Sequence, residues 1–222
     1  MKISELSHES GVPVASIKWF KREGLLPDGR ATSATMVEYG PDHVKRLRLI
    51  KALTAVAGLS IAATREVLLA IDEARSPAQT LKAVSYAMSV PTGGRAASAE
   101  RDEPSDEADG RAEVDELIEA MGWDVDGDSP HVQGLATTLR EMDRMGVGLP
   151  RDALTSYARL AGTAARLDIE RAASVDDQLA LAERAAVSLA LSGPLLELLR
   201  RVAQEDCVRR LDAVRASTRR RR

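Results

Sequence analysis

The sequence predicts an all-α protein with one small β element near the amino end. Three observations favour this fold class. The chain has 222 residues, of which 44% are hydrophobic but only 3% aromatic, and it is rich in the helix formers Ala, Leu, Arg and Glu. Most apolar residues recur three and four positions apart, as on one face of a helix. Only residues 28–40 combine turn signals with the weak alternation of a two-stranded hairpin.

Residues 3–23 predict two short helices joined by a tight turn. Gly11 favours the left-handed conformation that closes the first helix, and Gly24 does the same for the second. Pro27 lacks a backbone N–H and therefore prevents the second helix from resuming. Helix, glycine-containing turn and helix together make a helix-turn-helix.

The second of these helices has two different faces. Ile17 and Phe20 are three positions apart, so they share one face and are expected to be buried. Lys18, Lys21 and Arg22 occupy the rest of the surface. A short helix with one buried seam and a cationic outer face fits a DNA major groove.

The next segments predict a wing and two more helices. Residues 28–40 are expected to form a two-stranded wing that lies along the phosphate backbone. A third helix is expected over about 41–56, with Pro41 in its first turn. Gly58 ends that helix, and Ser60 caps a fourth. Residues 1–72 carry ten Lys and Arg against eight Asp and Glu, so this part is locally basic although the chain has a formal net charge of −3.

This succession resembles the DNA-binding domain of the MerR family of bacterial transcription regulators. The matching residues are KISEL at 2–6, GV at 11–12, SIKWF at 16–20, REGLLP at 22–27, Tyr39, LRLI at 47–50 and GLSI at 58–61. They cover about the first third of the chain and span four helices and a wing in the same order, which makes the resemblance specific. A lone helix-turn-helix match would be much weaker.

The resemblance implies DNA-binding roles for particular positions. Ser16 and Lys18 stand where the recognition helix contacts bases or backbone, and Trp19 replaces the usual tyrosine that lies against the DNA backbone. Arg30 and Tyr39 match the start and end of the wing. With the neighbouring cations, the expected DNA-binding set is Ser16, Lys18, Trp19, Lys21, Arg22, Arg30 and Tyr39. The chain departs from the family where wings usually read Gly-Tyr-Arg, because these positions hold Thr35, Met36 and Val37.

The resemblance also implies a mechanism and partners. Family members act as homodimers on double-stranded promoter DNA whose spacer is overlong, and their active form bends and untwists that spacer for RNA polymerase, which they affect indirectly. The dimer usually forms through a long antiparallel helix after the fourth helix. Here that position holds a shorter helix, so we expect it and the later helices to share the dimer contacts. No sustained heptad run predicts a long coiled coil.

The rest of the chain is expected to be helical around one linker. The predicted regions are a winged helix-turn-helix DNA-binding domain (1–72), a connecting or dimerisation helix (73–90), a flexible acidic linker (91–111) and a helical effector-binding or dimerisation domain (112–222). The expected helices of the last region are 112–121, 130–145, 150–173, 175–191 and 194–216. Residues 219–222 are four arginines that either attract phosphates or simply end the last helix.

The sequence contains no recognisable catalytic or metal-binding constellation. The three histidines are far apart, and the acidic residues at 124–128 lack the glutamate of a calcium loop, since that position is Gln133. Cys207 is the single cysteine and lies on an apolar stripe, which favours core packing over redox sensing. We therefore expect no enzyme, no metal and no cofactor. No segment approaches a membrane span of about 20 apolar residues, and no leader is expected before the first helix, so a cytoplasmic location is expected.

A small-molecule effector is a further hypothesis. Apolar, adaptable side chains are concentrated in the second domain, and helical domains often bind lipophilic molecules among such residues. The candidates are Met121, Trp123, Met142, Met145 and Tyr157, with a pocket expected near Trp123 and Tyr157. Taken singly, each is better explained as an ordinary core residue, so the hypothesis depends on the group. The alternative functions are a ligand-independent repressor or architectural DNA-binding protein controlled by a protein partner, and, less favoured, an enzyme fused to a DNA-binding domain.

Overall fold

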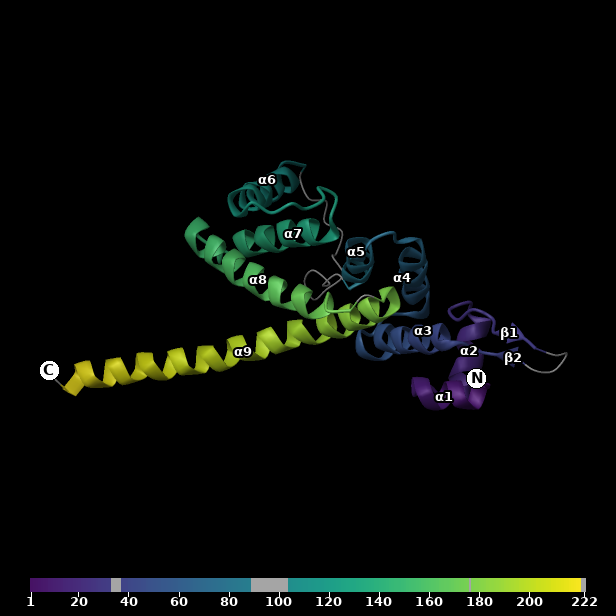
Figure 1. Cartoon of the computed structure of the whole chain (residues 1–222). Coiled ribbons are helices and arrows are strands. Elements are labelled where there is room, and N and C mark those ends of the chain that lie inside the picture. Colours follow the sequence, from purple (N-terminus) through teal and green to yellow (C-terminus); the bar gives the residue numbers. More distant parts are fainter. Residues whose placement is uncertain (33–36, 89–103, 176, 221–222) are drawn as a thin grey trace.

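Helices make up most of the computed structural model, which describes residues 1–32, 37–88, 104–175 and 177–220 (Figure 1). The elements are α1 (Ile3–Ser10), α2 (Val14–Arg22), β1 (Arg30–Ala31), β2 (Val37–Glu38), α3 (Pro41–Lys51), a π-helical turn η1 (Ala52–Val56), α4 (Ile61–Glu73), α5 (Pro77–Ala87), α6 (Pro104–Met121), α7 (Pro130–Arg144), α8 (Arg151–Ala172) and α9 (Gln178–Arg220). The predicted all-α class with a small β wing is confirmed.

The helix-turn-helix forms as its glycines predict. Gly11 has a φ of +65° and ends α1, and Gly24 has a φ of +71° and ends the turn after α2. Both angles lie in the left-handed region, which a side chain would strain. Ile17 and Phe20 are buried, so α2 presents the expected seam to the core.

The wing is a short antiparallel pair. Arg30 lies opposite Glu38, and Ala31 lies opposite Val37. Its tip, including the family-divergent positions 35 and 36, lies outside the described residues. The base of the wing is fixed by the amino end of the chain, since the N–H of Tyr39 donates to the carbonyl of Met1 and the Met1 amino group donates back, each at 2.9 Å.

The third and fourth helices also follow the sequence. Pro41 begins α3, whose path continues through η1 until Gly58, which has a φ of +72°. Ser60 caps α4, because its hydroxyl accepts from the N–H of Ala63 at 3.2 Å. The π-helical turn is a detail that hydrophobic spacing does not reveal.

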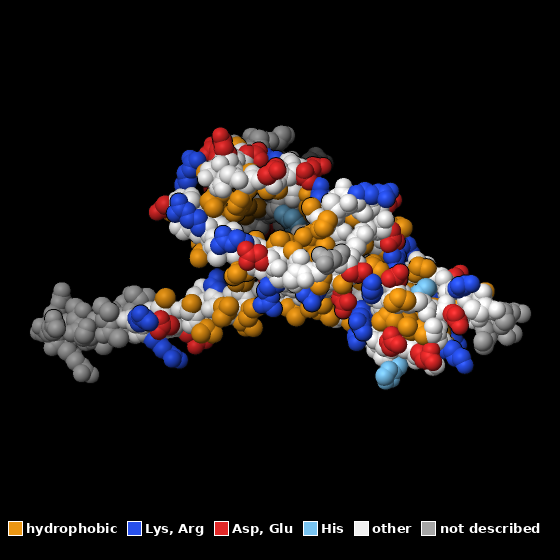
Figure 2. Space-filling model, viewed as in Figure 1, with side chains coloured by type: hydrophobic (Ala, Val, Ile, Leu, Met, Phe, Trp, Pro, Cys, Tyr) orange, Lys and Arg blue, Asp and Glu red, His pale blue; other side chains and the backbone are white. Residues whose placement is uncertain are grey.

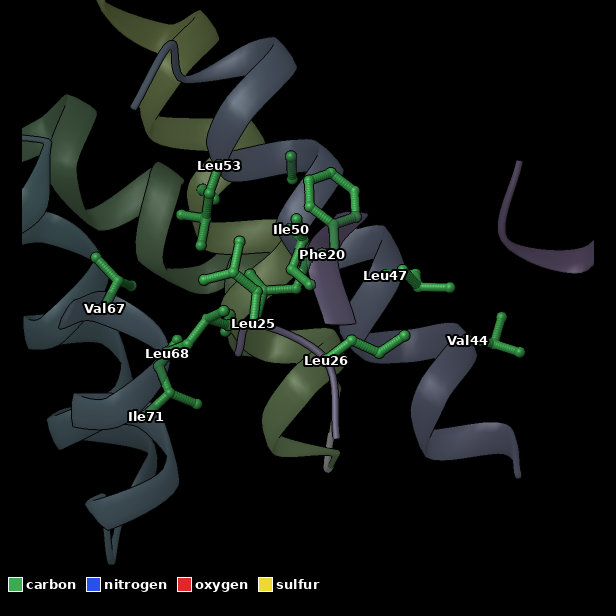
Figure 3. Packing of buried hydrophobic residues seen from close by; sticks show 14 of the residues in the cluster. Phe20, Leu25, Leu26, Val44, Leu47, Ile50, Leu53, Val67, Leu68 and Ile71 are labelled. Atoms are coloured by element: carbon green, nitrogen blue, oxygen red, sulfur yellow. The ribbon is translucent and has the colours of Figure 1, made fainter. Parts of the chain in front are cut away.

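These helices share one hydrophobic core (Figure 3). Leu47 and Ile50 of α3 are fully buried, as are Leu25 after α2 and Leu68 and Ile71 of α4. Truncating such a side chain to alanine costs about 2–5 kcal/mol. This core fixes the orientation of α2 relative to the wing.

The same core includes the first half of α9. Leu181, Ala182, Ala185 and Ala186 are buried against it, and α9 packs on α3, η1 and α5. Small side chains allow α9 to approach those helices closely. The expected helical domain from residue 112 to the end is therefore not one packing unit, since residues around 181–189 join the amino-terminal core instead.

Helices α6, α7 and α8 form a second, smaller core. Its buried residues are Val114, Leu117, Val132, Ala136, Leu139, Leu154 and Ala158. Helix α6 begins at Pro104, inside the stretch expected to be a linker, and a proline suits the first turn of a helix. The segment 104–111 is thus helical, although it was expected to belong to the linker, and residues 89–103 lie outside the described part.

The last helix corrects two predictions. Residues 178–220 form one helix, although Gly193 and Pro194 were expected to divide it. A proline removes one backbone hydrogen bond and crowds the preceding turn, but long helical flanks on both sides can carry such an interruption. Cys207 is exposed rather than packed in a core, because the second half of α9 projects away from the body (Figure 1).

The length and apolar composition of α9 differ from the expectation that no segment could span a membrane. Among the described residues, the stretch Gln178–Arg210 is long and apolar enough to do so by these two criteria alone. Its first half, however, supplies Leu181 and Ala185 to the amino-terminal core. This half of α9 is therefore part of a folded domain.

Thr64 places a hydroxyl inside the first core. Its side chain is fully buried, and its Oγ1 has no hydrogen-bond partner among the described residues. An unsatisfied buried polar group costs about 1–3 kcal/mol. We expect Thr64→Val, which keeps the shape, to raise the free energy of unfolding in urea by about 1 kcal/mol. Ser60→Ala, which removes the cap of the same helix, should lower it by a similar amount, about 1 kcal/mol. A less stable Thr64→Val variant would mean that the hydroxyl is bonded.

Asp177 ties the start of α9 to α3. Its carboxylate accepts from the Lys45 ammonium at 2.7 Å and from the N–H of Ala180 at 2.9 Å. The bond from Lys45, with that from Ala180, lowers the pKa of Asp177. Because the pKa of Asp177 is lower in the folded state, the ion pair stabilises the fold at pH values above the pKa of the unfolded state, about 3.9. This stabilisation is lost as the pH falls through the pKa of the folded state.

We therefore expect Asp177→Asn to lower the melting temperature at pH 7. The amide oxygen of the asparagine still caps α9, so the decrease in melting temperature reports the loss of the charge alone. The difference from the wild type should shrink below about pH 4. A difference that stays constant from pH 7 to pH 3 would contradict the role of the ion pair.

Candidate nucleic-acid interface

Helix α2 presents its polar side chains outward from a rigid position. Lys18 and Arg22 are exposed, Ser16 is half-buried, and Trp19 is 37% exposed. The opposite seam is fixed, since Phe20 is 7% exposed and its ring centroid lies 5.3 Å from that of Trp19. With Lys21, which is half-buried, five of the seven predicted DNA-binding residues thus lie on this one helix without being buried.

Lys21 lies between α2 and the wing. Its ammonium is 2.9 Å from the Asp28 carboxylate and 5.7 Å from the centre of the Tyr39 ring. The hydrogen bond with Asp28, and to a lesser degree Tyr39, raises the pKa of Lys21. Lys21 therefore stays cationic, but its charge is partly neutralised, so it orients the wing rather than offering a free cation.

Tyr39 differs most from its predicted role. The side chain is only 6% exposed, and its ring meets the His43 ring edge-on with centroids 5.2 Å apart. A ring buried at the base of the wing does not offer its face to DNA. Its observed contacts instead position Lys21 and the start of α3.

The wing places one predicted cation on the surface. Arg30 is exposed in β1, and the residue opposite it, Glu38, is exposed as well. Neighbouring opposite charges reduce the net attraction to phosphates. The wing is therefore less cationic than α2.

Two arginines that the sequence did not single out hold the end of α2. From α3, the Arg46 Nε donates to the carbonyl of Leu25 at 2.9 Å, and its Nη1 is 2.5 Å from the Asp72 carboxylate. From α4, the Arg65 guanidinium donates twice to the carbonyl of Glu23, at 3.2 and 2.7 Å. A helix end leaves carbonyls unsatisfied, and cations there are favourable. Arg46 and Arg65 therefore fix the turn that follows α2.

The proposed effector residues do not gather at a described groove. Trp123 packs on the second core, with its ring 3.6 Å from where a Cβ on Gly162 would lie. Met145 and Tyr157 are 77% and 54% exposed. Neither of the two grooves that the structure describes, one between α8 and α9 and one between α4 and α5, is lined by any of the five candidates. The ligand site near Trp123 and Tyr157 stays a prediction.

The acidic turn after α6 makes a structural contact. The Asp126 carboxylate pairs with the Lys82 ammonium of α5 and accepts from the Tyr86 hydroxyl at 3.3 Å. The bond from Lys82 lowers the pKa of Asp126. Among the described residues, no three His, Cys, Asp or Glu side chains are grouped so as to hold a metal ion.

Comparison with known proteins gives a family and a similar solved structure. The family model for MerR HTH family regulatory proteins matches residues 1–71. The chain is similar to SCO5550 of Streptomyces coelicolor A3(2), a protein proposed to be a transcriptional regulator, with 32% sequence identity and a TM-score of 0.68. The similarity covers 93% of this chain and 95% of that crystal structure. No curated protein matches the chain.

Proposed function

Because this chain belongs to the MerR family of helix-turn-helix regulatory proteins, we propose that it is a bacterial, cytoplasmic transcription regulator that binds promoter DNA as a homodimer. The observation that carries the proposal is the outer face of α2, where Lys18 and Arg22 are exposed on a helix clamped by Arg46 and Arg65. A rigid helix with exposed cations can enter the major groove without paying for ordering on contact.

Residues on α2 and in the wing would have different roles in DNA binding. Lys18 and Ser16 would contact base edges, while Arg22 and Arg30 would attract the phosphate backbone. Trp19, at the edge of the same face, would lie against the sugar-phosphate chain. Because phosphate contacts release counterions, the affinity should fall steeply with salt.

The homodimer is proposed to form through α9. Leu191, Leu195, Leu198 and Val202 are four, three and four positions apart, and each is at least 56% exposed. Figure 2 shows hydrophobic side chains along the part of α9 that extends beyond the body. A heptad stripe of this kind is stable in water only when another helix covers it. An antiparallel copy of α9 would supply that helix and place two reading helices in one assembly.

The regulatory mechanism is proposed from the family resemblance. A dimer bound across an overlong promoter spacer would bend and untwist it, so RNA polymerase would respond to the DNA and not to a direct contact. This is indirect readout, in which the deformation energy of the DNA depends on the conformation of the protein. A small apolar effector that shifts this conformation would change transcription with little change in DNA affinity.

One observation favours a second candidate function. The five proposed effector residues line neither described groove, so a regulator without a small-molecule ligand also fits. In that case the protein acts as a repressor or architectural protein controlled by a protein partner. Transcription that responds to a purified small molecule would exclude this candidate.

Selection of genomic DNA tests the proposed function. Fragments retained by the protein from its own genome are expected to share an inverted repeat located between promoter elements. Lys18→Ala should lose this enrichment, whereas Arg159→Ala, an exposed cation on α8, should keep it. Fragments without a common motif would point to an architectural protein, and no retained DNA would refute the proposal.

Trp19 offers a direct optical signal for DNA binding. The chain has two tryptophans, Trp19 on the reading helix and Trp123 on the second core. In a Trp123→Phe background, we expect the fluorescence of Trp19 to change saturably with duplex DNA. In a Trp19→Phe background the signal of Trp123 should stay constant during the same titration. The opposite pattern would mean that DNA binds elsewhere.

A further inference from the structure

A groove lies where α8 and α9 meet above α3. Its volume is about 1120 Å³, and Arg48, Asp168, Arg171, Glu183 and Arg184 contribute charged groups to its wall. Its apolar wall comes from α9 and includes Val187, Leu191 and Leu195. From this junction the two helices diverge as the arms of a V (Figure 1).

The α8 arm carries an apolar stripe of its own. Tyr157, Leu160, Ala164 and Leu167 are three, four and three positions apart, and Arg171 of the groove follows four positions later. Residues at this spacing share one helix face, so the stripe leads into the groove. Tyr157, Leu160 and Leu167 are 54%, 69% and 55% exposed, which leaves the stripe uncovered in a single chain.

The α9 arm continues the groove in the other direction. Leu191 and Leu195 line the groove, and Leu198 and Val202 extend the same heptad beyond it. Both arms therefore present leucine-rich heptad faces that begin at one junction. Two such faces at an angle leave room for a third helix that packs on both.

We propose that the second half of the partner's α9 lies in this V, so that it packs on α8 as well as on α9. This inference rests on the proposed homodimer and extends it. It adds α8 to the dimer interface, so the unit formed by α6, α7 and α8 takes part in dimerisation. The partner helix is a suitable occupant since it is long, projects from its own body and carries a matching stripe.

The heptad register supports an antiparallel arrangement. With the two-fold axis between Leu195 and Leu198, positions 191 and 202 face each other, and so do positions 188 and 205. Each pair joins an a position with a d position, which is the layering of antiparallel helices. The same register brings residues 205–210 of the partner to the groove end of the V.

One charge pair at that end is complementary, since this register places the partner's Arg210 opposite Glu183, whereas the partner's Arg209 lies opposite Arg184. The groove presents Asp168 and Glu183 together with Arg48, Arg171 and Arg184. The arriving segment carries the partner's Glu205 and the partner's Asp206, followed by the partner's Arg209 and the partner's Arg210. Burial raises the pKa of Glu183 against the opposing effect of Arg48 and Arg184, so an arriving cation would compensate this carboxylate.

Paired substitutions test the role of α8 separately from dimerisation through α9. Leu160→Glu with Leu167→Glu should raise the dimer dissociation constant at least about tenfold, because leucines that are buried on pairing would become charged. Leu69→Glu, which changes an equally exposed leucine on α4, should leave it unchanged. Sedimentation equilibrium measures both, and circular dichroism checks that the helices persist.

The outcomes are distinguishable. If the α8 double variant dimerises as the wild type does while Leu195→Glu with Leu198→Glu does not, the dimer stands and the role of α8 is refuted. If neither variant affects dimerisation, both the α9 dimer and the inference fail.

A cross-linking measurement decides the case even where the α8 variant is unstable. A benzoylphenylalanine at position 160 should cross-link to residues 202–210 of the other copy, in mixtures of ¹⁵N-labelled and unlabelled protein. The same group at Arg159, about 100° around α8 from position 160, should give no such product. A cross-link within one chain, to a different protein, or to nothing would overturn the proposal.

Discussion

The Lys18→Ala variant is expected to bind its operator about a hundredfold more weakly than the wild type, because each of two copies loses a contact worth about 1–3 kcal/mol. Lys18 is exposed on α2, and its side chain contributes nothing to the core, so the fold should be unaffected. Fluorescence anisotropy with a labelled operator at fixed salt gives the dissociation constant, and thermal melting checks the fold.

Arg159→Ala is the matched control for that measurement. It removes an exposed cation from α8, far along the chain from the reading helix. Its operator affinity should equal that of the wild type. Equal affinity of Lys18→Ala and the wild type would remove α2 as the recognition helix.

The second large effect is expected at α9. Leu195→Glu combined with Leu198→Glu should raise the dimer dissociation constant by at least about a hundredfold, since four leucines of the pair become charged. Both side chains are more than half exposed in one chain, so the monomer should keep its melting temperature. Dimerisation, measured by sedimentation equilibrium, and operator binding should be lost together, because a monomer reaches only one half-site.

Leu69→Glu is again the control, since it places the same charge on an exposed leucine of α4. It should leave both dimer and operator binding intact. A monomeric Leu195→Glu, Leu198→Glu variant that still binds the full operator with wild-type affinity would contradict the need for a dimer.

The amino-terminal fold was predictable because its signals are local. Gly11 and Gly24 end their helices with positive φ, Ser60 caps α4, and the spacing of Ile17 and Phe20 correctly gave the buried face of α2. Each of these depends on residues within one turn of one another. Propensity and periodicity therefore decide them before tertiary contacts form.

The rest depends on long-range packing that spacing does not encode. Pro194 is a strong local signal for a break, yet α9 passes through it. Cys207 was expected to pack in a core, but it is exposed, because the described residues leave this part of α9 uncovered.

The candidate site shows the same limit. The cations of α2 could be identified from the sequence of that helix alone. The roles of Arg46 and Arg65 could not, because the carbonyls that they bind lie more than twenty positions away in the sequence. Tyr39 was placed on the DNA side by resemblance, and its burial against His43 and Lys21 is a tertiary fact. Positioning residues of this kind have no short motif, because their partners are backbone atoms.

Hydroxyl-radical footprinting of the selected operator tests the central claim most directly. Two reading helices on one assembly should protect two patches of backbone on the same side of the duplex, separated by whole turns of about 10–10.5 base pairs, and Lys18→Ala should erase both patches together. A single protected patch, two patches on opposite sides of the duplex, or protection that survives in Lys18→Ala would contradict it.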